Sequence, residues 1–175
     1  CSDCMNAPKP PWTRAYALFK YTDEVRDCVH LFKYRKRTEL ARPLARLAAG
    51  LLDETSPHYD AVVPVPLHWR RFLQRGYNQS ALFAGELALR AGIPAMRLLK
   101  RERHTPKQAF LTRKERNLNI KGAFSILNST DAEKRSILLV DDVMTTGATL
   151  SEAAGVLLNC CAARVDVLVI ARRQR

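Results

Sequence analysis

A short apolar run, from Ile137 to Val140, constrains the fold of this chain more than any other feature of the sequence. Four consecutive apolar residues flanked by polar ones are the pattern of a β-strand that is buried on both faces. Further strand patterns alternate with helix patterns along the 175 residues. We therefore predict an α/β fold in which helices flank a mainly parallel sheet.

The other regular elements are predicted from residue periodicity and from helix start and stop signals. Thr22 followed by two acidic residues is a helix start signal, and Gly92 with Pro94 closes a helix. The segment 97–119 has many charges and little apolar periodicity, so no element is predicted there. Strands are predicted over 14–21, 61–65, 122–127, 136–140 and 165–171, and helices over 22–34, 40–51, 78–91 and 148–162.

Two carboxylates, Asp141 and Asp142, directly follow the apolar run. In open parallel sheets, ligands bind in the crevice beyond the carboxyl ends of the strands. Thr145, Thr146 and Gly147 predict a tight turn that opens a helix, and a helix N-terminus offers free N–H groups to an anion. This combination fits a sugar phosphate whose hydroxyls, or a metal bridging them, meet the carboxylates. The alternative is an ordinary strand–turn–helix unit in which these side chains are caps.

A second strand end, between Val62 and Ser80, precedes a run of basic residues. Arg70, Arg71 and Arg75 are predicted to lie in a loop that leads to a helix beginning near Asn78. Arginine can bind phosphate through two parallel hydrogen bonds, so this loop suits a second anion close to the first. The alternative is a surface turn that carries scattered arginines.

The charge balance favours a polyanionic ligand or partner. The chain has 29 basic and 17 acidic residues, a net charge of +12, which suits nucleic acid, a polyphosphate substrate or an acidic partner. A solvated basic surface is the alternative. No apolar run approaches the roughly 18 residues of a membrane span, and the N-terminus lacks the regions of a signal peptide. We therefore expect a cytoplasmic protein without membrane insertion.

Five cysteines, an odd number, argue against a fully disulfide-bonded secreted framework. Cys28 shares a helical face with apolar residues and is predicted to lie in the core, while Cys160 and Cys161 are interpreted as packing residues. Cys1 and Cys4 have the spacing of half a structural zinc site, which needs two more ligands. We predict that residues 1–12 are the remnant of a zinc module with its linker and that residues 13–175 form the main domain.

The stretch from Ile137 to Thr149 resembles the phosphoribosyl-pyrophosphate (PRPP) motif of type I phosphoribosyltransferases. The resemblance implies that Asp141 and Asp142 are the catalytic pair and face the ribose 2′ and 3′ hydroxyls or their Mg²⁺, while the turn holds the 5′-phosphate. It also implies that segment 98–124 includes a flexible loop that closes over substrate. The PRPP-binding set would be Asp141, Asp142, Val143, Thr145, Thr146, Gly147, Ala148 and Thr149, and the pyrophosphate and flexible-loop set would be Arg70, Arg71, Arg75, Asn78, Gln79, Arg101 and Arg116.

Over nearly the whole chain, the motifs are similar to those of the ComF/GntX-like proteins, which are associated with DNA uptake and competence. The resemblance implies a Mg²⁺-dependent displacement of pyrophosphate from PRPP by an acceptor that no residue identifies, and a cysteine zinc module at the N-terminus. The competing hypothesis is a non-catalytic adaptor that binds single-stranded DNA or a DNA-uptake helicase, with PRPP as a regulatory ligand. The matching motifs are Lys33-Tyr34, Pro64 to Leu67, Arg75-Gly76, Asn78-Gln79, and Arg101, Thr105, Gln108, Arg116 and Asn119.

Overall fold

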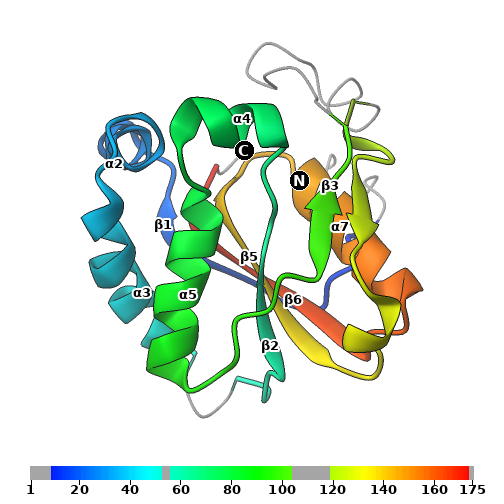
Figure 1. Cartoon of the computed structure of the whole chain (residues 1–175). Coiled ribbons are helices and arrows are strands. Elements are labelled where there is room, and N and C mark those ends of the chain that lie inside the picture. Colours follow the sequence, from blue (N-terminus) through cyan, green and yellow to red (C-terminus); the bar gives the residue numbers. More distant parts are fainter. Residues whose placement is uncertain (1–8, 53–55, 104–118, 174–175) are drawn as a thin grey trace.

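A computed structural model of the chain describes residues 9–52, 56–103 and 119–173 (Figure 1). The strands are β1 (Ala15–Lys20), β2 (Ala61–Pro64), β3 (Leu99–Arg101), β4 (Phe124–Ile126), β5 (Ser136–Met144) and β6 (Arg164–Arg172). Four of them form a parallel sheet in the order β1–β6–β5–β2. The other two, β3 and β4, form a separate antiparallel pair. The predicted mainly parallel α/β fold is thus confirmed.

Helices cover both faces of the central sheet (Figure 1). They are α2 (Asp23–Tyr34), α3 (Ala41–Ala49), α4 (Trp69–Arg75), α5 (Gln79–Ala91) and α7 (Ala148–Asn159), with short 3₁₀ helices η1 (Thr38–Leu40) and η3 (Ser129–Asp131). In β5, Leu138 and Val140 belong to the core cluster that includes residues of α2, α3 and α5. Ile137 and Leu139 belong to the opposite cluster, which includes residues of α7. This alternation confirms that the apolar run is a strand buried on both faces.

Local signals set the ends of the helices near the sheet edge. The Thr22 hydroxyl accepts a hydrogen bond from the N–H of Val25 and caps α2, as its sequence predicts. The Asn78 side chain accepts the N–H of Ser80 at 3.0 Å and caps α5. The same helix ends at Gly92, whose φ of +67° lies in the left-handed region that glycine tolerates. These boundaries agree with the predicted ones.

Several elements differ from their predicted forms. The basic stretch after β2 is the helix α4 and not a loop, because His68 accepts the N–H of Arg70 at its start and Gly76, with a φ of +83°, ends it. The strand β3 lies where the charged sequence predicts no element. The helix α7 ends at Asn159, short of the predicted residue 162. The strand β5 continues through the two carboxylates to Met144 instead of ending before them.

The leucine spacing of residues 40–51 predicts α3 but not its buried face. Leu44 is buried as expected, whereas Leu47 is 53% exposed. Ala45 and Ala48, both fully buried, belong with Leu44 to the core cluster that also contains residues of α5. These small side chains let α3 pack closely against α5. The leucine spacing does not predict this face, because the residues that form it are mainly alanines.

The cysteine predictions hold only in part. Cys28 is half-buried and not a full member of the core. Cys160 packs against the cluster on the α7 face, as predicted, but Cys161 is exposed. Cys1 and Cys4, and with them the zinc half-site, lie outside the described residues.

Two further predictions, the flexible loop and the absence of a membrane span, depend on which parts of the chain the structure describes. Arg116 and most of the charged segment that contains it lie outside those parts. Within residues 9–52, 56–103 and 119–173, none of the helices has the length and apolar character needed to cross a membrane.

Candidate functional site

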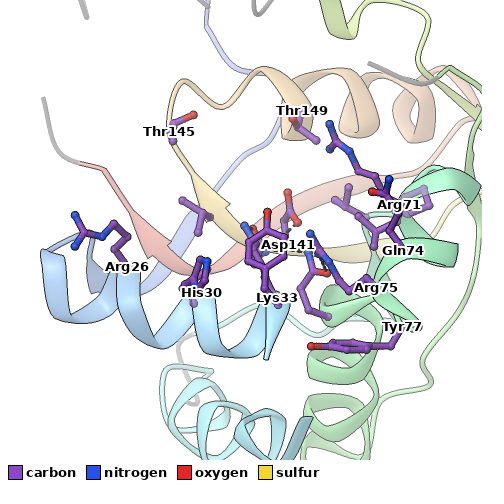
Figure 2. A pocket seen from close by; sticks show the side chains of 18 of the residues that line it. Arg26, His30, Lys33, Arg71, Gln74, Arg75, Tyr77, Asp141, Thr145 and Thr149 are labelled. Atoms are coloured by element: carbon purple, nitrogen blue, oxygen red, sulfur yellow. Dashed lines mark hydrogen bonds and ion pairs between the residues drawn. The ribbon is translucent and has the colours of Figure 1, made fainter. Parts of the chain in front are cut away.

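The two carboxylates lie where the sheet opens at the end of β2. Pro64, the last residue of β2, pairs with Val140 of β5, and β5 then continues beside β6 alone as far as Met144. Asp141 and Asp142 therefore stand just beyond the end of a neighbouring strand, where both line a cavity of about 770 Å³; Figure 2 shows Asp141 among the residues of this cavity. This is the crevice at the carboxyl ends of parallel strands in which α/β proteins bind ligands.

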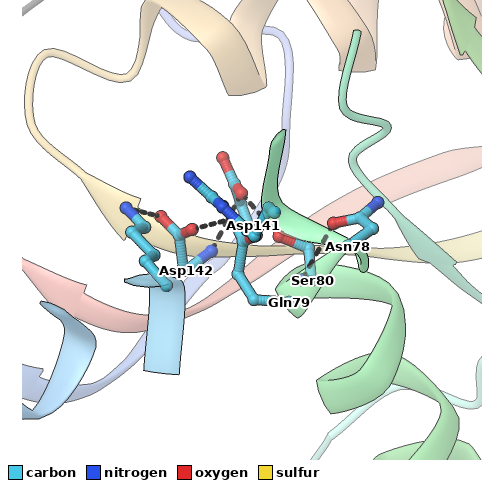
Figure 3. Close-up of polar contacts among 7 residues, drawn as sticks. Asn78, Gln79, Ser80, Asp141 and Asp142 are labelled. Carbon is cyan, nitrogen blue, oxygen red and sulfur yellow. Dashed lines mark hydrogen bonds and ion pairs between the residues drawn. The ribbon is translucent and has the colours of Figure 1, made fainter. Parts of the chain in front are cut away.

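Asp142 is held by side chains from two helices on the same face of the sheet (Figure 3). Its Oδ1 lies 2.8 Å from Nζ of Lys33 in α2. Its Oδ2 accepts a hydrogen bond from Nε2 of Gln79, whose own Oε1 accepts one from Arg75. Only 5% of Asp142 is exposed, so this ion pair is largely removed from water. The motif residues Arg75 and Gln79 thus connect α4 to the carboxylate.

Asp141 has hydrogen-bond donors but no direct cationic partner among the described contacts. Its Oδ1 accepts the Ser80 hydroxyl and the backbone N–H of Asp142, both at 2.9 Å. Burial and the adjacent charge of Asp142 raise the pKa of Asp141 to about 7, against the opposing effect of Lys33. A cation or a pair of hydroxyl donors at this carboxylate would relieve the cost of its charge.

The turn after β5 forms the second part of the site. Gly147 has a φ of +80°, in the left-handed region, and is the N-cap of α7. A small hollow of about 30 Å³ lies against the turn and the first residues of α7. The first N–H groups of a helix have no carbonyl partner within the helix, so such a position suits an anion, although the N–H of Ala148 already donates to the Thr146 hydroxyl at 3.4 Å. Thr145 and Thr149 line both this hollow and the larger cavity. The hollow is lined by Val143, Met144, Thr145, Thr146, Gly147, Ala148, Thr149 and Leu150.

Arginines form the third part, on the side of the cavity made by α4 and β3. Arg71 and Arg75, one helical turn apart, line the cavity (Figure 2), and Arg101 of β3 lines it with them. Burial, followed by the nearby charge of Arg71, lowers the pKa of Arg101 to about 10. Burial and the charge of Arg75 likewise lower the pKa of Arg71. These half-buried like charges favour an anion between them.

Among the members of the predicted pyrophosphate set that the structure describes, Arg70 and Asn78 do not line the cavity. Arg70 is exposed, and its guanidinium lies over the ring of Trp69, 5.3 Å from the centroid. Asn78 caps α5 and donates to the carbonyl of Val65 at 3.0 Å, so it ties the helix to the strand end. Asn78 therefore positions the start of α5 behind the site, and Arg70 lies on the outer surface.

The wall formed by α2 is the part of the site that the sequence does not predict. Figure 2 shows Arg26, His30 and Lys33 on the same side of α2, with Lys33 at the carboxylates. The rings of His30 and Tyr34 lie 4.8 Å apart, and the guanidinium of Arg75 lies 5.0 Å from the Tyr34 ring, so the stack reaches from α2 to α4. Two signals in the sequence bear on this wall. One is the Lys33-Tyr34 motif, to which the sequence attaches no role in the site, and the other is the three- and four-residue spacing of Arg26, His30 and Lys33, which places them on one helical face.

The described residues suit a metal ion that binds together with a phosphate ligand better than a metal ion held by protein side chains alone. Among them, there is no group of three or more histidine, cysteine or acidic side chains that could hold a metal ion. Mg²⁺ commonly binds through one or two carboxylates together with phosphate oxygens of a substrate and water. The pair Asp141 and Asp142 fits that donor set, with Asp142 already paired to Lys33.

Comparison with known sequences gives consistent relatives. Residues 77–175 match the family described as "Phosphoribosyl transferase domain". "Competence protein F" of Haemophilus influenzae is 32% identical over 179 residues, which cover 98% of this chain and 78% of the relative. "DNA utilization protein YhgH" of Salmonella typhi is 36% identical over 181 residues, with 98% and 77% covered. "Competence protein ComFC" of Bacillus subtilis is 32% identical over 145 residues, with 82% and 57% covered.

Comparison with solved structures supports the same fold. The glutamine PRPP amidotransferase of Bacillus subtilis, solved with ADP and GMP, superposes with a TM-score of 0.54. The match covers 80% of this chain and 30% of that chain at 19% identity. At this identity the likeness concerns the fold alone.

Proposed function

Because this chain belongs to the ComF family of phosphoribosyltransferase-domain proteins and has their type I phosphoribosyltransferase fold, we propose that its cavity binds PRPP. The relatives carry names that refer to competence and DNA utilization. We propose that this protein acts in the same process, in the cytoplasm, and that it displaces pyrophosphate from PRPP.

One observation carries the proposal: an acidic pair, of which Asp141 has no cationic partner in its described contacts, lies between the turn that opens α7 and a set of neighbouring arginines. Without ligand, both charged clusters are unfavourable, as the raised pKa of Asp141 and the lowered pKa of Arg101 indicate. PRPP has a phosphate at one end, hydroxyls in the middle and a diphosphate at the other end. A single ligand of this kind satisfies all three parts of the cavity.

The bound orientation follows from the chemistry of each part. The 5′-phosphate accepts hydrogen bonds from the N–H groups of the turn and from the hydroxyls of Thr145 and Thr149. The ribose hydroxyls donate to Asp141 and Asp142. The diphosphate then points towards the arginines of α4 and β3, where Arg71 and Arg75 bind it. In this orientation, the carboxylates are next to the sugar and the cations are next to the leaving group.

The reaction breaks the bond between ribose C1′ and the diphosphate oxygen and forms a bond from C1′ to an acceptor. Positive charge develops on the ribose as the leaving group departs, and fixed charges that match it lower the barrier. Asp141 and Asp142 stabilise the sugar side, and Arg71 and Arg75 stabilise the departing diphosphate. Mg²⁺, when bound with PRPP at the carboxylates, supplies further neutralisation of the diphosphate charge.

Calorimetric titration tests the proposal. We expect PRPP to bind more tightly than ribose 5-phosphate, which lacks the diphosphate, and ribose 5-phosphate to bind more tightly than ribose. Release of pyrophosphate from PRPP, screened across candidate acceptors, then tests catalysis separately. Failure of both PRPP and ribose 5-phosphate to bind at millimolar concentration would refute the proposed function. Binding without pyrophosphate release for any acceptor would favour a regulatory ligand over a substrate.

A second candidate function, binding of single-stranded DNA, rests on the outer face of α4. Trp69, Phe72 and Leu73 are 58%, 47% and 71% exposed, and Arg70 lies over the Trp69 ring. Aromatic side chains with interleaved cations are the usual platform for single-stranded nucleic acid. With this function the protein is an adaptor that has PRPP as a regulatory ligand. We expect Trp69→Ala to weaken single-stranded DNA binding and leave PRPP binding unchanged, and the absence of DNA binding at low salt would exclude this candidate.

A further inference from the structure

The indole ring of Trp12 lies against the phosphate-binding turn from outside the cavity. Trp12 is in the segment that leads into β1, and it is half-buried against the core cluster on the α7 face. A Cβ atom placed on Gly147 would lie 3.0 Å from Cη2 and 3.6 Å from Cζ2 of this ring. The indole thus fills the space beside Gly147 that any larger residue would need.

The segment that carries Trp12 is fixed to the sheet immediately after the ring. The N–H of Thr13 donates to the carbonyl of Val165 at 3.0 Å. The N–H of Arg14 donates to Oδ1 of Asp166 at 2.9 Å. Asp166 is fully buried and also accepts the hydroxyl of Tyr59 at 2.8 Å. With these anchors in place, the indole keeps its position relative to the sheet.

The turn itself depends on a conformation that few residues adopt. Gly147 has a φ of +80°, and its carbonyl accepts the N–H of Ser151 at 2.8 Å in the first turn of α7. The ring of Trp12 contacts the turn at this residue, while the residues lining the cavity and the small hollow do not include Trp12. The turn is therefore held between the indole on one side and the ligand space on the other.

We propose that Trp12 is a positioning residue for the 5′-phosphate: its indole holds the turn from Thr145 to Thr149 in the conformation that binds phosphate. This inference rests on the proposed function, because it takes the turn as the phosphate site. It couples the N-terminal segment to PRPP affinity, since any change that displaces Trp12 also releases the turn. If the free turn adopts the binding conformation only part of the time, affinity falls by that fraction.

The coupling makes a selective prediction for three ligands measured by calorimetry. Trp12→Ala should weaken ribose 5-phosphate and PRPP by the same factor, about 5- to 20-fold, because both carry the 5′-phosphate. Inorganic pyrophosphate, which binds at the arginines, should keep its affinity. Trp12→Phe should restore most of the loss, because a ring again fills the space. Leu89→Ala, at a site 79% exposed on α5, is the matched control for removal of an apolar side chain.

Fluorescence gives an independent measurement. The chain has two tryptophans, so the emission of Trp12 can be isolated in a Trp69→Phe background. Ribose 5-phosphate should change this emission, and inorganic pyrophosphate should not. Unchanged affinity for ribose 5-phosphate in Trp12→Ala, or equal weakening of all three ligands, would overturn the coupling while the proposed function stands. A wild-type protein that binds neither PRPP nor ribose 5-phosphate would overturn the proposed function and the coupling with it.

Discussion

The two neighbouring carboxylates of the site should have opposite effects on stability. Asp142, which is buried, has the half-buried ammonium of Lys33 as its partner at 2.8 Å. Asp141 has no such partner in its described contacts, and burial beside Asp142 raises its pKa. Asp141→Asn should therefore stabilise the ligand-free protein, whereas Asp142→Asn should destabilise it by leaving the Lys33 charge without its counterion.

The magnitudes follow from the two environments. A rise of the Asp141 pKa from 3.8 to about 7 corresponds to a cost of at most about 4 kcal/mol for the ionised form, at 1.36 kcal/mol per pKa unit. Asparagine retains an oxygen that can accept the hydrogen bonds of Ser80 and of the Asp142 backbone. For Asp142→Asn, loss of one partner of a buried pair costs roughly 3 kcal/mol.

The pH dependence separates this explanation from a change in packing. Since the folded-state pKa of Asp141 is raised, the ionised carboxylate destabilises the fold increasingly as the pH rises from about 4 to 7. The gain from Asp141→Asn should accordingly be about 2 to 3 kcal/mol larger at pH 8 than at pH 5. Urea unfolding of the wild-type and variant proteins at both pH values measures it. A gain that does not change with pH, or a variant less stable than wild type at pH 8, would show that the Asp141 charge is not the cause.

Three further predictions concern single residues around the cavity. Arg75→Ala should weaken PRPP binding by roughly 1.5–3 kcal/mol, the value of a charged hydrogen bond, and should weaken ribose 5-phosphate binding less. Arg70→Ala is the control, and equal losses of PRPP affinity in the two variants would remove Arg75 from the diphosphate site. Gly76→Ala should lower the free energy of unfolding by about 1–3 kcal/mol because residue 76 has a positive φ. Gly147→Ala should lower it more, since the new Cβ would also meet the indole ring of Trp12, and equal losses in urea unfolding would contradict the contact between Trp12 and Gly147. Gln79→Leu should lower the free energy of unfolding by about 1–3 kcal/mol, because it removes one hydrogen bond each from the buried Asp142 and the half-buried Arg75, and an unchanged urea midpoint would show that Gln79 does not link these two residues.

Much of the fold is predictable from the sequence because its signals are local. The buried strand from Ile137 to Val140, the tight turn at Gly147 and the caps of α2 and α5 each depend on residues that are close in the chain. The helix α4 is harder to predict, because Trp69, Phe72 and Leu73 point to solvent and no buried apolar face marks it. Its start and end depend on a histidine cap and on one glycine.

The site is predictable only as far as its motifs reach. The acidic pair and the turn are contiguous in the chain, so the sequence alone indicates that they lie close together. The pairing of Lys33 with Asp142 joins residues far apart in the chain, and no spacing rule connects them. The same holds for Trp12 and Gly147, whose contact depends on how the indole just before β1 packs against the core cluster on the α7 face. Such contacts are properties of the tertiary fold and not of any one segment.

A crystal structure of the protein with PRPP and Mg²⁺ would decide whether the three parts of the cavity bind one ligand. We predict that the 5′-phosphate lies on the N–H groups between Thr145 and Thr149 and that the ribose hydroxyls face Asp141 and Asp142. We also predict that the diphosphate lies between Arg71 and Arg75 of α4 and Arg101 of β3. A ligand bound elsewhere, or bound in reverse with its diphosphate on the turn, would contradict the proposed function of the cavity.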